Sequence, residues 1–132
     1  MKTIKLFIAF IASAVLITGC QSKQENMKNE LVDFIKKFDS AYIPLYKSVN
    51  LASWDASITG SPEDFKKSED LQMKLVKLFA DKESLKKLEN IKVSGMITDS
   101  LLLRQLDVLY RAFMMAKADT AKLNAVVRMQ SA

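Results

Sequence analysis

The chain has 132 residues, of which 27% are charged, and a net charge of +5. This length allows one small domain. The complete absence of histidine excludes Ser/His/Asp triads, Cys/His pairs and imidazole metal ligands. Lysines are spread along the predicted helix faces, often beside acidic residues, and form no stripe with aromatic residues, so we expect no nucleic-acid partner. The carboxylates are predicted to lie on helix surfaces or helix caps, and the chain as given is therefore not expected to be an enzyme.

The N-terminus has the layout of an export signal. Lys2 and Lys5 precede an apolar run from residue 6 to 17, which is shorter than the roughly 20 residues that span a bilayer. Small residues follow this run and lead to Cys20, the only cysteine, in an arrangement that resembles a bacterial lipobox. An ordinary signal peptide with a chance cysteine is the alternative. We predict a lipoprotein signal peptide over 1–19, lipid (palmitate) on Cys20, a lipidated tether over 20–24 and a membrane partner reached through this lipid. Gln21, in place of Asp, favours the outer membrane of the cell envelope.

Apolar residues at spacings of three and four predict a long helix over about 25–56. They are Met27, Leu31, Phe34, Ile35, Phe38, Tyr42, Leu45 and Val49. Pro44 lies inside this pattern and cannot donate a backbone hydrogen bond, so a bend is expected near Ile43.

Capping signals predict the remaining helices. Ser61-Pro62-Glu63-Asp64 is a strong helix start, and that helix is expected to end near Ala80. Asp81 is the expected N-cap of a short third helix, and 98–100 is expected to cap a fourth after a connector over 92–97. Asp119 is the expected cap of a fifth helix carrying Leu123, Val126 and Val127. The prediction is an all-α antiparallel bundle of four to five helices, with a bent first helix, preceded by a signal-peptide helix.

Four side chains are candidates for a functional role. Trp54 either lines a channel or, as we prefer, plugs the joint between the first two helices as an apolar anchor. Tyr42 and Tyr46 are one turn apart and either stack on a ligand or, preferably, belong to the core and the helix joint. Arg104 is expected to pair with Asp107 or with an acid on another helix in preference to binding a ligand.

Several short motifs occur in a recognisable order. They are Tyr42-Ile43-Pro44-Leu45-Tyr46, Trp54-Asp55-Ala56-Ser57-Ile58-Thr59-Gly60, the predicted helix from Asp81 to Leu88, and Thr98-Asp99-Ser100-Leu101-Leu102-Leu103-Arg104-Gln105-Leu106. Together they resemble the N-terminal helices of bacterial zinc metallopeptidases of the angiotensin-converting-enzyme and oligopeptidase (peptidyl-dipeptidase) type. The likeness covers nearly all of the chain after the signal peptide.

The resemblance implies a lid or substrate gate over a peptide channel, formed by residues 25–132 as the N-terminal part of a longer peptidase. The family binds zinc through H-E-x-x-H, and this chain lacks the motif. The zinc cofactor and the peptide substrate would therefore belong to a catalytic part outside this sequence, and no cofactor is expected within it. The alternative is a complete small helical lipoprotein that acts as a binding or scaffold module.

Overall fold

The chain forms four helices, seen in a computed structural model that describes the backbone of residues 2–118 and 129 and the side chains of 22–117 and 129. They are α1 (Lys2–Thr59), α2 (Pro62–Phe79), α3 (Lys82–Ser94) and α4 (Ser100–Ala118). No strand occurs among the described residues. The predicted all-α architecture is therefore confirmed, whereas the predicted fifth helix and its cap at Asp119 lie outside the described residues.

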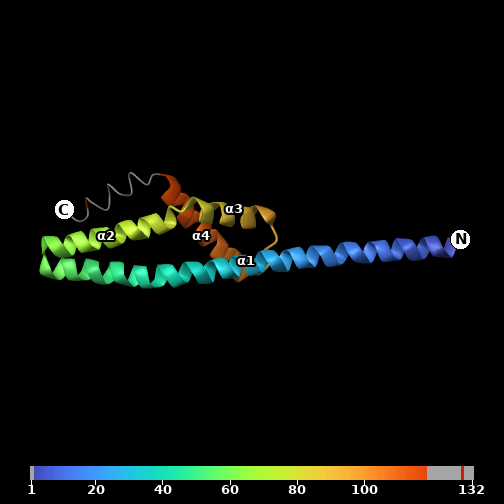
Figure 1. The fold of residues 1–132 in the computed structure, drawn as a ribbon, viewed down its shortest axis with the longest axis horizontal. Coiled ribbons are helices and arrows are strands. Elements are labelled where there is room, and N and C mark those ends of the chain that lie inside the picture. The colour runs from blue at the N-terminus through green and yellow to red at the C-terminus, as the bar shows by residue number, and fades with distance from the viewer. Residues whose placement is uncertain (1, 119–128, 130–132) are drawn as a thin grey trace.

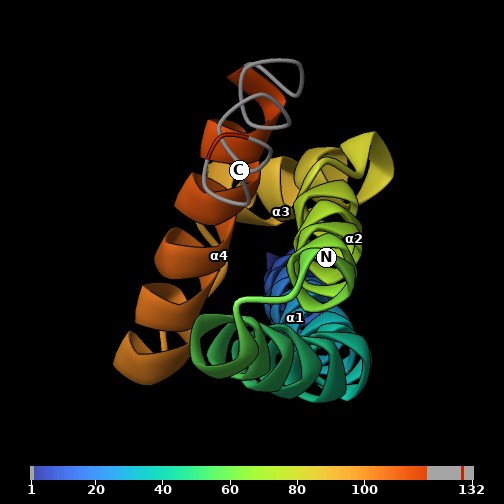
Figure 2. The same cartoon turned by 90° about the vertical axis from the view of Figure 1, so that its left-hand side faces the viewer.

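The helices are arranged as a long hairpin with a shorter one beside it. Figure 1 shows α2 running back along α1, α3 continuing in the direction of α2, and α4 returning alongside α3. The end view in Figure 2 places α2 and α3 on one side of α1. The N-terminal part of α1 extends beyond the other three helices (Figure 1).

Side-chain caps begin each of the three shorter helices where the sequence predicts them. The Ser61 hydroxyl accepts a hydrogen bond from the backbone N–H of Asp64 at 3.1 Å. The Asp81 carboxylate accepts from the N–H of Ser84, and the Asp99 carboxylate accepts from the N–H of Leu102, each at 2.8 Å. Such bonds satisfy N–H groups in the first helical turn that have no partner within the helix.

Two expectations about local structure, the bend at Pro44 and the start of the connector after α3, need correction. The helix α1 is continuous from Lys2 to Thr59, and both residues 20–24 and Pro44 lie inside it. It follows only a gentle curve in Figure 1. Proline removes one bond of the helical ladder, but Phe38 and Val49 are buried on either side of Pro44 and keep the helix against its neighbours. Similarly, α3 extends to Ser94, so the connector begins at Gly95, whose φ of 62° ends that helix.

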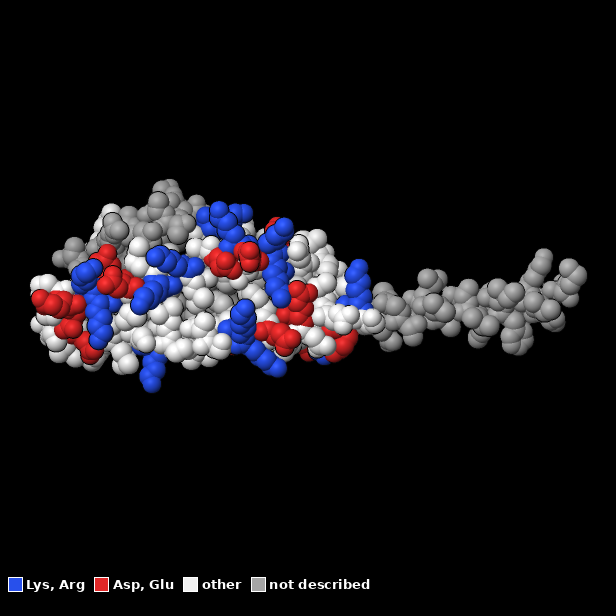
Figure 3. All heavy atoms as spheres, viewed as in Figure 1, with Lys and Arg blue, Asp and Glu red and all other residues white. Residues whose placement is uncertain are grey.

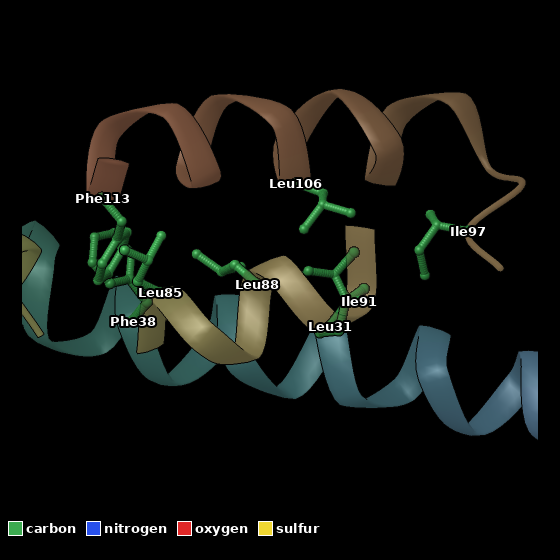
Figure 4. Close-up of a cluster of buried hydrophobic side chains, with 8 residues drawn as sticks. All are labelled: Leu31, Phe38, Leu85, Leu88, Ile91, Ile97, Leu106 and Phe113. Atoms are coloured by element: carbon green, nitrogen blue, oxygen red, sulfur yellow. The ribbon is translucent and has the colours of Figure 1, made fainter. Parts of the chain in front are cut away.

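The core lies between α3, α4 and the part of α1 that contains Leu31 and Phe38 (Figure 4). Its buried members are Leu31, Phe38, Leu85, Leu88, Ile91, Ile97, Leu106 and Phe113. Phe38 contacts the rings of Phe79 and Phe113 at centroid distances of 5.3 and 5.5 Å, which joins α1, α2 and α4 in one aromatic cluster.

Further along the hairpin, small residues take over the contact between α1 and α2. Ala52 and Ala56 are buried, and so is Ser68 on α2. The Ser68 hydroxyl lies 2.9 Å from that of Ser53 and accepts a hydrogen bond from Gln72 at 3.0 Å. Short side chains at these positions allow the two helices to approach closely, and the buried hydroxyl is satisfied.

Candidate functional site

The side chains singled out in the sequence do not form one site. Tyr42, Tyr46 and Trp54 lie on α1, whereas Arg104 lies on α4. Only the two tyrosines are brought together, with ring centroids 5.4 Å apart. Cys20 lies within α1, but its side chain is outside the described side chains.

The tyrosines extend the aromatic cluster of the core. The Tyr42 ring stacks on Phe38 at 5.3 Å and meets the edge of Phe79 at 5.7 Å, and the residue is half-buried. Tyr46 is 48% exposed and stacks on Tyr42 at the outer end of the row. Tyr42 is therefore a packing residue, as preferred, while Tyr46 has one face available to solvent.

Trp54 is not the predicted plug, because 67% of the residue is exposed. The joint between α1 and α2 is instead filled by Ala52 and Ala56. Since consecutive helical positions are about 100° apart, Trp54 is rotated by roughly 200° from each of these alanines and lies on the opposite side of α1. The bulk of an indole would also prevent the close approach that the alanines allow.

Arg104 is exposed and does not take Asp107 as its partner. Asp107 instead binds the ammonium group of Lys92 on α3. This ammonium also lies 5.4 Å from the centroid of the Tyr110 ring. The hydrogen bond from Lys92 holds the pKa of Asp107 below its ordinary value. The pair joins α3 to α4, and Arg104 faces a shallow hollow between α1 and α4 that Asp39 also lines.

A row of exposed apolar residues on α1 was not predicted from the sequence. We call it the outer row: Ile43, Leu51, Trp54 and Ile58, each between 54% and 67% exposed. The row shares one side of the helix, opposite the side that carries Val49, Ala52 and Ala56. The spacing of 51, 54 and 58 is present in the sequence, but the longer apolar pattern that ends at 42, 45 and 49 pointed to a different side of the helix.

A second exposed row follows α4. The residues of this α4 row, Leu101, Val108 and Met115, are seven apart and are each more than 60% exposed. Leu101 and Val108, with Ile35 and Leu109, line the hollow between α1 and α4, which has a volume of about 320 Å³.

The face drawn in Figure 3 carries intermixed basic and acidic side chains, with uncharged surface between them.

A second hollow, of about 580 Å³, lies where α1 meets the end of α2 and the start of α3. Phe34, Phe38 and Phe113 line it, and charged residues of both signs surround them. Phe38 and Phe113 are themselves buried, so the aromatic rings serve the core and offer little surface to a ligand.

The described side chains do not fit the zinc site of the resembled peptidases. No three acidic side chains among them lie close enough together to hold a metal ion, and the sequence supplies no histidine.

In the part of the chain that the structure describes, no helix is both long and apolar enough to cross a membrane.

Comparison with known proteins adds no relative. No protein-family model matches the chain, and neither the curated proteins nor the solved structures contain a significant match.

Proposed function

We propose that this chain is the N-terminal lid region of an exported zinc metallopeptidase of the peptidyl-dipeptidase type, anchored to the cell envelope by lipid on Cys20. In this proposal, residues 25–132 cover a peptide channel that a separate catalytic part forms. The chain then contributes substrate gating, and the zinc and its ligands belong to the catalytic part.

The α4 row carries this proposal. Leu101, Val108 and Met115 lie in line along α4 and are exposed. Exposed apolar residues that lie in line on one side of a helix are candidates for a binding surface. A lid that rests on a larger catalytic body needs an apolar face of this kind, and the adjoining hollow between α1 and α4 provides a recess for side chains of that body.

The positions of the motifs in the fold give further support. The stretch from Trp54 to Gly60 forms the last turns of the long helix α1 and the turn after it. The pair α2 and α3 follows, and Arg104-Gln105 lies on the next helix, α4. This is the helix order that the resemblance implies.

A complete small helical lipoprotein, acting as a binding or scaffold module, is the second candidate. The observation that favours it is the shared core: Leu31, Leu88, Leu106 and Phe113 are each at most 1% exposed, although they come from three different helices. A module with its own core does not need a catalytic body to fold.

The native gene product separates these two functions. The lid proposal expects the reading frame to continue beyond codon 132 into an H-E-x-x-H helix, and an antibody against residues 62–79 to detect a much longer product. In that product, Val108→Glu should reduce chelator-sensitive peptide cleavage, because it places a charge in the interface with the body. Val93→Glu is the matched control, since Val93 is 81% exposed on α3 and outside the α4 row. A native product that ends with the printed chain would refute the lid proposal and support the module.

A further inference from the structure

The outer row of α1 has no partner within the described fold. Its four residues face away from the buried alanines, and Figure 2 shows α2 and α3 on the other side of α1. The same helix therefore presents one apolar side to its own core and a second apolar side to solvent. The second side spans from residue 43 to 58, about 22 Å of helix at 1.5 Å per residue.

The polar side chains next to the outer row are already satisfied within α1. The Ser48 hydroxyl donates to the carbonyl oxygen of Pro44 at 2.9 Å, and the Asn50 amide donates to that of Tyr46 at 2.8 Å. The Ser57 hydroxyl donates to the carbonyl oxygen of Ser53 at 2.8 Å. Covering this side of the helix would therefore leave these three side chains with their hydrogen-bond donors satisfied.

Two charged residues accompany the row, Lys47 and Asp55. Both are exposed, and neither has an ion-pair or hydrogen-bond partner among the described residues. They are eight positions apart on one helix, about 12 Å along its axis, which is too far for them to pair with each other. They lie at equal distances along the chain on either side of Leu51.

We propose that the outer row is an interface for a second copy of this chain, with the two α1 helices packed antiparallel and crossing at Leu51. A twofold axis through Leu51 relates position 51+n of one helix to position 51−n of the other. Lys47 then lies beside Asp55 of the second copy, and the symmetry forms this ion pair twice.

The apolar residues also find partners in this arrangement. The two Leu51 side chains meet at the axis, and Ile58 packs over Pro44 and Ile43 of the second copy. Trp54 lies against Ser48 of the second copy, a small residue whose hydroxyl is bonded within its own helix. The large indole is thus placed opposite a small side chain, as close helix packing requires.

The charges favour a second copy over a lipid surface. An amphipathic helix that binds anionic lipid carries several basic residues on its polar face, whereas Lys47 here is balanced by Asp55. The surface that the four residues of the outer row would bury is small compared with the roughly 800 Å² per partner of standard interfaces. The proposed dimer is therefore weak, and its formation depends on protein concentration. This interface is separate from the α4 row and does not depend on the proposed lid function.

Cysteine cross-linking tests the symmetric contact. In the full chain, produced in an exporting bacterial host, Leu51→Cys places two thiols at the axis, and mild oxidation should give a disulfide-linked dimer. Val93→Cys is the control, because Val93 lies on α3 and, at 81% exposed, is more accessible than Leu51 at 54%. The wild-type chain, in which Cys20 is the only cysteine, gives the baseline. Equal dimer yields from the two variants would overturn the proposal.

A charge exchange tests the register. Lys47→Glu and Asp55→Lys should each weaken self-association about tenfold in sedimentation analysis, because each replaces two attractive pairs with two repulsive ones. The double variant Lys47→Glu/Asp55→Lys restores both pairs and should return to within about threefold of the wild type. Circular dichroism checks that helix content is unchanged. A double variant as weak as the single variants, or a wild-type chain that stays monomeric at millimolar concentration, would refute the interface.

Discussion

Phe113→Ala should be among the most damaging substitutions in this chain. Phe113 is 1% exposed and is the residue of α4 that reaches the aromatic cluster. Its ring lies 5.4 Å from that of Phe79 on α2 and 5.5 Å from that of Phe38 on α1, measured between centroids. Removing the ring leaves a cavity where three helices meet (Figure 4).

The expected cost is about 4 kcal/mol, since Phe→Ala substitutions in cores typically cost about 3–5 kcal/mol through lost burial and the cavity that remains. Domains of this size are stable by only about 5–15 kcal/mol. At about 4–8 °C per kcal/mol, the melting temperature should fall by roughly 15–30 °C. The helices themselves would persist in part, because their caps and internal hydrogen bonds are untouched.

Urea unfolding followed by far-ultraviolet circular dichroism measures this loss. Met114→Ala is the matched control, because the neighbouring Met114 is 41% exposed and should change stability by no more than about 0.5 kcal/mol. If Phe113→Ala cost less than about 1 kcal/mol, then α4 would not be packed against α1 and α2 as described.

Three further outcomes are expected. Trp54 should be almost as accessible to iodide quenching in the dilute folded chain as in the urea-unfolded chain, because the residue is exposed. For the same reason, Trp54→Phe should change the free energy of unfolding by no more than about 0.5 kcal/mol. Strong protection of the indole on folding would contradict both expectations. Asp81→Ala should cost about 1 kcal/mol at pH 7 through loss of a helix cap. Hydrogen bonds from Ser84 lower the pKa of Asp81 in the folded state, so this stabilisation is present above the unfolded pKa near 4 and is lost as pH falls through the lower folded value; a deficit that widened in acid would contradict this. Finally, Cys20→Ser should abolish incorporation of radiolabelled palmitate and release the chain from the membrane fraction, and labelling that persisted in this variant would place the lipid elsewhere.

The helix ends were largely predictable from the sequence because the signals that set them act within one turn. Ser61, Asp81 and Asp99 each accept a bond from the N–H three residues further on, so the cap and its partner lie together in the chain. The core side of α1 was predictable for a related reason, since side chains three and four positions apart share one side of any helix. These local rules were sufficient for the all-α fold.

Local rules did not determine how the helices are rotated against one another. The incorrect predictions for Trp54 and for the partner of Asp107 follow from that. Trp54 and Ala56 are only two positions apart. Ala56 is the residue buried at the joint, because α2 approaches α1 closely there through Ser68. Asp107 bonds to Lys92, fifteen positions earlier, and not to nearby Arg104. Burial and ion pairing depend on which sides of distant helices meet, and only the tertiary structure determines this. The outer row is distinguished from the core side of α1 only in the tertiary structure, where Val49, Ala52 and Ala56 are covered and the outer row is not.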